Sequence, residues 1–376
     1  MREQCDKMRA MIDLGIQGFF DDIAGYFSTP SVLGIDIGTV SMKLVELSRK
    51  ADVMTLENYG ILETREYLNR GNASIQTSSL KISQREAIPI LKKLIDEVKP
   101  KTRQVIASIP SFSTFFVTVE MPAMAPAEVG KAIQFQARQY IPIPISEVSI
   151  EWTKMSEFQN ERGQPTHRYF LTATPNALVK TYTEIFKGAG LHLISLEVET
   201  AALVRSLMGA TNPITMIMDI GGQSTEFIVV EQGTIKRVTQ SDYAGSTLTQ
   251  ALSHTLDISS KRAEELKRRK GLLGSGGEYE LSTSLLSFLD VIIQECERAK
   301  REYERVSGKT VEELMIVGGG SNLKGLEKYV KEQMQIRIHA PDALWRFKRP
   351  IELEPILPEL NRELATATGL ALRKFL

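Results

Sequence analysis

Cysteine and histidine are scarce in this 376-residue sequence, which contains two cysteines and four histidines. Cys5 and Cys296 lie far apart, so they give neither a disulfide framework nor the paired spacing of a zinc site. The histidines, at positions 167, 192, 254 and 339, also lack ligand spacing. The composition therefore disfavours a Cys/His metal centre and favours a reducing, cytosolic environment.

An excess of charge is also missing, because 46 acidic residues balance 46 basic ones. A chain without a positive field is a poor candidate for binding nucleic acid. No stretch predicts a transmembrane helix or a signal peptide, so we expect the protein to stay inside the cell. Residues 1–30 carry apolar residues at helical spacing, but the acidic residues between them disfavour a membrane-surface helix. We predict a disordered or partner-docking arm there.

What the sequence does contain is one motif twice. Residues 33–47 read LGIDIGTVSMKLVEL, and residues 216–230 read MIMDIGGQSTEFIVV, with Asp36 and Asp219 at equivalent positions. Each copy predicts an apolar strand that ends near its aspartate, a tight glycine turn and a second apolar strand. This pattern indicates an internal duplication and not a short-period solenoid.

The two turns have the features of a phosphate-binding hairpin. Glycine lets the backbone approach an anion and direct several N–H groups toward it, and an aspartate at a strand end can hold Mg²⁺ through water. A single such turn is more often an ordinary β-hairpin, but two copies favour a paired nucleotide clamp. The metal ligands would be Asp36 and Asp219, and the phosphate contacts would be Gly38, Thr39, Val40, Gly221, Gly222, Gln223 and Ser224.

Two kinds of charged residue accompany the hairpins. Lys43, on the second strand of the first copy, is either a phosphate ligand or a solvated strand lysine. Glu199, with Glu197 as the alternative, is a candidate for orienting a water at the terminal phosphate. An acidic residue at the start of a helix is also favoured by the helix dipole alone, so both interpretations of this position stay open.

A nucleoside would need further contacts in the second half of the chain. Glu264 and Lys267 share one side of a charged helix predicted over residues 259–271, where they either meet a ribose and a base or face solvent. A buried strand over residues 314–317 then runs into a glycine-rich turn that lets a flat ligand approach the backbone. The residues of this turn are Gly318, Gly319, Gly320, Ser321 and Asn322.

The order of predicted elements divides the chain. Residues 111–195 read as strand, helix, strand, strand and helix, which predicts a small α+β insert without a catalytic constellation. A helix over residues 196–208 leads into the second hairpin. We predict an N-terminal arm (1–30), a first-lobe core (31–110 with 196–213 and 351–376), the inserted subdomain (111–195), a second-lobe core (214–240 with 311–350) and an outer subdomain (241–310).

The glycine motifs at residues 36–39, 219–222 and 317–321 resemble the phosphate 1, phosphate 2 and adenosine motifs of the actin, DnaK-type chaperone and sugar kinase superfamily. Residues 199–202 are similar to its first connecting helix, and residues 263–267 to the adenosine-contacting helix of MreB and FtsA. The resemblance implies an α/β, actin-like ATPase fold of two duplicated ribonuclease-H-like lobes. It also implies that the insert is placed as in FtsA, in the first lobe.

Within this superfamily, residues 32–376 most resemble the PilM family of type IV pilus assembly. The resemblance includes SVLGIDIGTVSMKLVEL, QARQYIPIPISEV, GSTLTQAL followed by AEELKRRKG, and ATGLALR at residues 367–373. It implies ATP and Mg²⁺ between the lobes. It also implies a groove between the first-lobe core (1A) and the insert (1C) for the N-terminal cytoplasmic peptide of PilN, and contacts with other pilus platform and motor proteins. Ala244 and residues 340–350 depart from the family pattern.

Three functions compete. The first is a nucleotide-gated assembly scaffold. The second is an ATPase or a sugar-kinase-like phosphotransferase, but a kinase needs a substrate-side base that the insert does not supply, so at most slow hydrolysis through Glu199 is expected. The third is an FtsA-like division protein, which would end in an amphipathic helix, whereas this sequence stops at Leu376 after its last core helix.

The expected location follows from the scaffold hypothesis. We expect a cytoplasmic protein at the inner face of the cytoplasmic membrane, attached to it only through partners, that binds no nucleic acid. A homo-oligomer is an open alternative.

Overall fold

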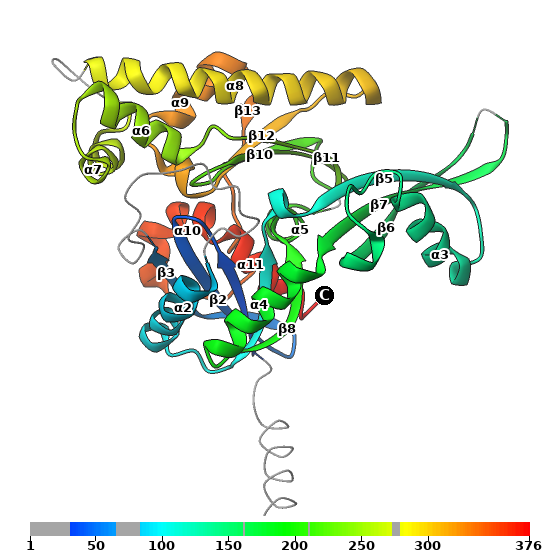
Figure 1. Cartoon of the computed structure of the whole chain (residues 1–376). Coiled ribbons are helices and arrows are strands. Elements are labelled where there is room, and N and C mark those ends of the chain that lie inside the picture. The colour runs from blue at the N-terminus through cyan, green and yellow to red at the C-terminus, as the bar shows by residue number, and fades with distance from the viewer. Residues whose placement is uncertain (1–30, 65–82, 161, 210, 273–278) are drawn as a thin grey trace, which may run out of the picture.

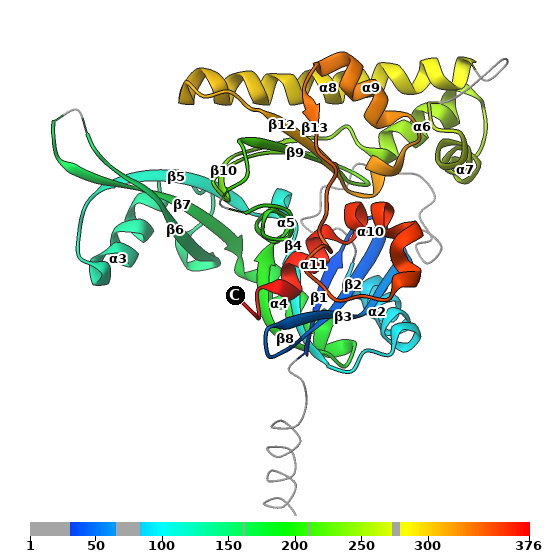
Figure 2. The same ribbon diagram turned by 180° about the vertical axis from the view of Figure 1, so that it is seen from behind.

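The structure is a computed structural model that describes residues 31–64, 83–160, 162–209, 211–272 and 279–376. The arm predicted over residues 1–30 therefore lies outside the described residues, as does Cys5. Figures 1 and 2 show two lobes stacked one above the other, with a smaller sheet that projects sideways from the lower lobe.

The lower lobe is built on a mixed sheet in the order β3-β2-β1-β4-β8. Its strands are β1 (Ser31–Ile37), β2 (Ser41–Lys50), β3 (Val53–Glu63), β4 (Gln104–Ile109) and β8 (His192–Val198). Alternate residues of β1 face opposite ways, so Leu33 and Ile35 pack against α2 (Gln84–Val98) and α4 (Asn176–Gly188), while Val32 packs against α11 (Ala365–Leu372). A capping box between Ser83 and Glu86 starts α2.

The upper lobe repeats this sheet in the order β11-β10-β9-β12-β13. Its strands are β9 (Thr215–Ile220), β10 (Thr225–Glu231), β11 (Thr234–Ser241), β12 (Glu313–Val317) and β13 (Arg337–Ile338). Its outer face is covered by α6 (Gly245–Thr255), α8 (Tyr279–Ser307) and α9 (Leu326–Met334), and α7 (Ser260–Lys270) packs beside α6. Figure 1 shows α8 crossing the whole top of this lobe.

Two helices lie between the sheets. Leu203, Val204 and Leu207 of α5 (Glu199–Leu207) pack against the inner face of the upper sheet. A Cβ added to Gly369 of α11 would lie 1.7 Å from the carbonyl oxygen of Ala202, so only glycine lets α11 pack this closely against α5. The region between the lobes is thus a packed core around α5 and α11.

The projecting sheet belongs to the insert. It contains β5 (Phe115–Pro122), β6 (Val148–Gln159) and β7 (Pro165–Pro175) in the antiparallel order β5-β7-β6, and α3 (Pro126–Ala137) covers one face. A short 3-10 turn, Ser111–Ser113, connects the lower lobe to β5.

One element boundary differs from the sequence prediction. The helix expected over residues 196–208 begins only at Glu199, because residues 192–198 pair with β4 as strand β8. In the insert, β6 and β7 stay paired as far as Gln159 and Pro165. In the upper lobe, α9 begins at Leu326, after a 3-10 turn over Gly319–Asn322 and a left-handed Gly325 with φ of 87°.

Candidate functional site

The two glycine turns meet at one cleft of about 440 Å³ between the lobes. Both have the same closing bond, since Gly38 N donates to Ser41 O at 3.0 Å and Gly221 N donates to Ser224 O at 2.9 Å. A Cβ added to Gly222 would lie 2.2 Å from Val40 Cγ2, so the second turn touches the first. The duplication therefore yields two hairpins with the same closing hydrogen bond that are in direct contact.

The two aspartates line this cleft from opposite lobes. Asp36 is only 5% exposed, and Ser108 Oγ donates to its Oδ1 at 2.7 Å. The β1–β2 register pairs Asp36 with Lys43, whose Nζ lies 4.0 Å from Asp36 Oδ2 and whose side chain is 14% exposed. Lys43 is thus a cation of the cleft wall and not a solvated strand residue.

The same register in the second hairpin pairs Asp219 with an acid, Glu226. Glu226 lines the cleft and is 5% exposed. Thr200 Oγ1 donates to its Oε2 at 3.0 Å, while its Oε1 is buried with no hydrogen-bond partner among the described residues. Burial raises the pKa of Glu226 to about 8, and the nearby carboxylates of Glu199 and Asp219 add to the rise. Sequence reasoning missed Glu226, although its position equivalent to Lys43 was a usable signal.

The structure separates the two candidates for a water-orienting carboxylate. Glu199 is the first residue of α5 and lines the cleft, where Ser111 N donates to its Oε1 at 3.0 Å. Glu197 is not among the residues that line the cleft. Its Oε2 accepts from Arg205 Nη1 at 2.7 Å, on the other side of the strand end.

The predicted nucleoside contacts lie at the upper side of the same cleft. Lys267 is 8% exposed, and its Nζ donates to Gly245 O at 2.7 Å and to Thr249 Oγ1 at 2.8 Å. Glu264 pairs with Lys267 at 2.8 Å and accepts from Arg268 Nε at 2.8 Å. These side chains are therefore held by the protein at the cleft and do not form a solvated helix face.

The third glycine turn packs directly onto the second aspartate. Gly318 has φ of 83°, and a Cβ there would lie 2.2 Å from Asp219 Oδ1. Gly318, Gly319, Gly320 and Asn322 line the cleft. Ser321 does not: it is buried, and its hydroxyl donates to Gly318 O at 2.6 Å, so its role in this structure is to hold the turn.

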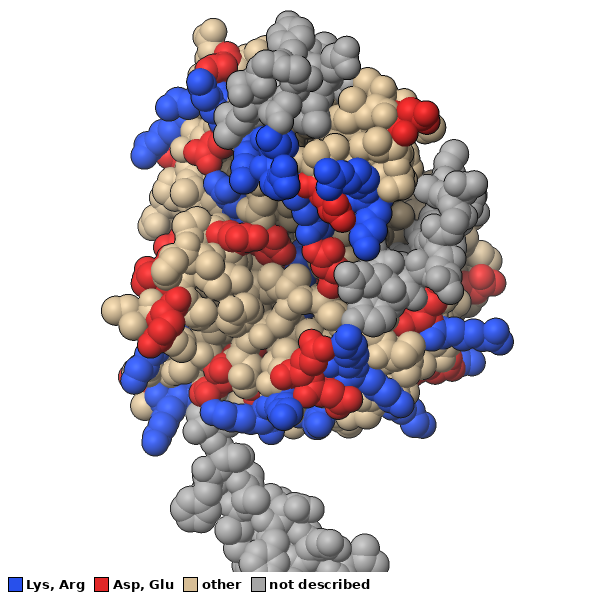
Figure 3. All heavy atoms as spheres, turned by 90° about the vertical axis from the view of Figure 1, so that its left-hand side faces the viewer, with Lys and Arg blue, Asp and Glu red and all other residues tan. Residues whose placement is uncertain are grey.

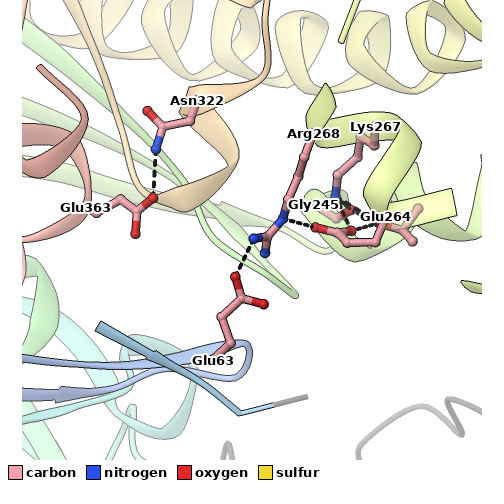
Figure 4. A network of polar contacts seen from close by, with 8 residues as sticks. Glu63, Gly245, Glu264, Lys267, Arg268, Asn322 and Glu363 are labelled. Atoms are coloured by element: carbon pink, nitrogen blue, oxygen red, sulfur yellow. Dashed lines mark hydrogen bonds and ion pairs between the residues drawn. The ribbon is translucent and has the colours of Figure 1, made fainter. Parts of the chain in front are cut away.

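Polar contacts join the lobes across the cleft, as Figure 4 shows. Arg268 of α7 forms an ion pair with Glu63 at the end of β3, and Asn322 Nδ2 donates to Glu363 Oε1 at 2.8 Å from α10 (Leu357–Glu363). Figure 3 shows acidic and basic side chains meeting between the two lobes on this side of the molecule. Sequence reasoning did not single out Arg268 or Glu63, because their pairing depends on how the lobes are stacked.

A second hollow of about 970 Å³ lies on the other side of α5. One wall is the face of the inserted sheet that α3 leaves uncovered, where the Phe116 and Phe170 rings stack with centroids 5.7 Å apart. Opposite are α5, whose Arg205 pairs with Glu197 at the end of β8, and the turn between β10 and β11. β6 is one of the two edge strands of the inserted sheet. We call this hollow the groove.

The described residues contain neither a clustered metal site nor a membrane-spanning helix. They hold no group of three or more His, Cys, Asp or Glu side chains arranged to bind a metal ion. No helix among them has the length and apolar character needed to span a bilayer.

Comparisons with known proteins agree with this architecture. A sequence profile for the family described as type IV pilus assembly protein PilM matches residues 34–375. Among solved structures, the PilM-PilN type IV pilus biogenesis complex superposes with a TM-score of 0.77 at 21% identity, over 92% of this chain and 99% of that one.

More distant matches share the fold. The ethanolamine utilization protein EutJ from Carboxydothermus hydrogenoformans gives a TM-score of 0.52 at 16% identity, over 92% of this chain and 90% of that one. MreB 5 of Spiroplasma citri bound to AMPPNP gives 0.52 at 12% identity, over 93% and 97%. The actin-like fold predicted from the glycine motifs is therefore confirmed.

Proposed function

Because this chain belongs to the PilM family of type IV pilus assembly proteins, we propose that it is an ATP-binding scaffold that holds the cytoplasmic tail of PilN. The observation that carries the proposal is the contact between two equal glycine hairpins at one cleft with an aspartate from each lobe. In this proposal the scaffold sits at the inner face of the cytoplasmic membrane through its partners and connects the pilus platform to cytoplasmic motors.

The chemistry of the cleft fits Mg²⁺-ATP. Its volume of about 440 Å³ lies within the usual range for small-molecule sites, about 300–1,000 Å³. Asp36 and Asp219 would hold Mg²⁺, and two carboxylates suit an ion that keeps several waters and shares phosphate oxygens. Bound Mg²⁺ would neutralise phosphate charge. Lys43 adds a second positive charge beside Asp36.

The glycine turns account for the rest of the nucleotide. The backbone amides of residues 38–40 and 221–224 would donate to phosphate oxygens. Glu264 and Lys267 would contact the ribose, and the turn over residues 318–322 would lie against the base. Gly222 and Gly318 support this arrangement because a side chain at either position would collide with the neighbouring turn or with Asp219.

The groove suits an extended peptide, and a PilM-PilN complex is among the similar structures. Phe116 and Phe170 offer an apolar wall, and the edge strand β6 leaves backbone groups on which a further strand can pair. We propose that the N-terminal PilN tail binds here, between the lower lobe and the insert.

The proposal is tested by two binding measurements on the full chain. Calorimetry should detect Mg²⁺-ATP binding that Asp219→Ala weakens strongly, because that variant removes one of two metal ligands. A labelled synthetic PilN tail should bind in fluorescence anisotropy, and Phe170→Ala should weaken it by removing half of the stacked wall. If Asp219→Ala binds Mg²⁺-ATP as tightly as the wild type, the proposed nucleotide site is wrong. If Phe170→Ala binds the tail as tightly as the wild type, the proposed peptide site is wrong.

A slow ATPase is the second candidate, and the position of Glu199 at the cleft favours it. If Glu199 orients a water, Glu199→Gln should keep the affinity for ATP and lose phosphate release in a single-turnover assay. Unchanged turnover would remove Glu199 from catalysis. The family match disfavours an FtsA-like division protein.

A further inference from the structure

Arg346 is a positively charged residue of the groove without an acceptor. It lines the groove, its Nε is buried, and it makes no hydrogen bond or ion pair with any residue that the structure describes. Its guanidinium lies 5.1 Å from the ring centroid of Trp345, a side chain that is 59% exposed. The Nε atoms of Arg237, Arg349 and Arg362 are also buried without an acceptor, but each of those guanidiniums pairs with a glutamate through Nη2, whereas Arg346 has no such pair among the described residues. The missing acceptor is therefore expected from another molecule.

The backbone holds Arg346 in place on both sides. Before it, Leu344 is fully buried and its N donates to Asn361 Oδ1 at 2.9 Å. After it, Lys348 is fastened to β3, because its N donates to Met54 O at 2.9 Å and its O accepts from Leu56 N at 2.9 Å. Because the backbone is already held, a ligand would need to order only the Arg346 side chain and not the segment that carries it.

The other charges of the groove do not compensate Arg346. Glu197 is neutralised by Arg205, and Arg373 lies 3.6 Å from the same carboxylate. Glu151, on the edge strand β6, is exposed to solvent and makes no ion pair in the described part of the chain. The groove therefore offers a peptide one partly buried, uncompensated cation.

We propose that Arg346 determines the specificity of the groove by pairing with an acidic side chain of the peptide that binds there. The guanidinium can present two parallel N–H donors that match a carboxylate. A peptide that places Asp or Glu against this pair is preferred over one that places an amide there. This inference rests on the proposed binding of the PilN tail.

The test uses the full chain and a fluorescein-labelled synthetic PilN tail, with each Asp or Glu of the tail changed in turn to Asn or Gln. We expect Arg346→Gln to weaken binding about 10- to 100-fold, as for a lost charge-assisted hydrogen bond. One of the tail substitutions should weaken binding to the wild-type chain by the same factor. The same substitution should not weaken binding to the Arg346→Gln variant any further. Lys348→Ala, an exposed change two residues away that is not in the groove lining, should have no effect.

Phe170→Ala separates this inference from the proposed function. If Phe170→Ala weakens binding of the tail and Arg346→Gln does not, the groove binds the tail without recognising an acidic side chain, and the inference is wrong. If Arg346→Gln weakens binding but no acidic substitution does, the acceptor is a backbone carbonyl and the inference is also wrong. A wild-type chain that fails to bind the tail overturns both proposals.

Discussion

Replacing Gly222 with alanine tests whether the two glycine turns form one site. The added Cβ would lie 2.2 Å from Val40 Cγ2 and 2.8 Å from Thr39 Oγ1. Carbon atoms pack at about 3.5–4.0 Å, so the two turns must separate by more than 1 Å, about 1.3–1.8 Å, unless Val40 changes rotamer. A displacement of about 1 Å between groups that hold one ligand can cost up to about 100-fold.

We therefore expect Gly222→Ala to weaken Mg²⁺-ATP binding about 10- to 100-fold in calorimetry. Val40 supplies the closest colliding atom, so adding Val40→Ala to Gly222→Ala should recover part of the affinity. The single variant Val40→Ala shows how much this change alone affects nucleotide binding. Gly130→Ala is the matched control, because its Cβ would make an ordinary 3.4 Å contact with Trp152 in the insert.

Two results would contradict the argument. Wild-type affinity in Gly222→Ala would mean that the turns do not act together on one nucleotide. A loss of affinity that Val40→Ala does not relieve would mean that the contact between the turns is not the cause.

Three further predictions concern a close contact between helices, a buried acid and an ion pair across the cleft. Gly369→Ala should lower the free energy of unfolding by about 3 kcal/mol in urea titrations, because the Cβ would lie 1.7 Å from Ala202 O, whereas Gly130→Ala should not. Glu226 has a native pKa of about 8, above its ordinary 4.5, so stability should fall as pH rises from about 4.5 to 8. Glu226→Gln should remove that fall and be more stable at pH 8.5 by roughly 3–5 kcal/mol; an unchanged pH profile would show that Glu226 ionises normally. Glu63→Gln should speed nucleotide release by up to about 5-fold and reduce its salt dependence, because it removes an exposed ion pair across the cleft to Arg268. Disrupting the Arg262–Glu265 pair, which stays within α7, should leave release unchanged.

The hairpins could be predicted from the sequence because their signal is local. Asp36 and Asp219 each end an apolar strand before a glycine turn, and a repeated local pattern folds twice in the same way. Glu226 could not be recognised by such reasoning. Its burial depends on α5 lying between the two sheets, and its Thr200 partner comes from the other lobe.

The remaining differences have the same origin. Residues 196–198 belong to strand β8 because they pair with β4, although the sequence predicted a helix from residue 196. The pairing of Arg268 with Glu63 and the position of Arg346 in the groove depend on segments more than a hundred residues away in sequence. No local pattern contains that information, so these residues emerge only from the assembled fold.

The two copies of the hairpin share the same backbone arrangement but differ in the residue paired with the aspartate. The turns close with the same hydrogen bond, yet the strand position that faces the aspartate is Lys43 in the lower lobe and Glu226 in the upper lobe. A second lysine at this position would have increased the affinity of the cleft for anions. Glu226 instead, whose pKa burial raises to about 8, brings no positive charge to this position, and it is joined to α5 through Thr200, a residue that also lines the groove. The hairpin that lacks a cation at this position is thus the one joined to the helix that separates the two hollows.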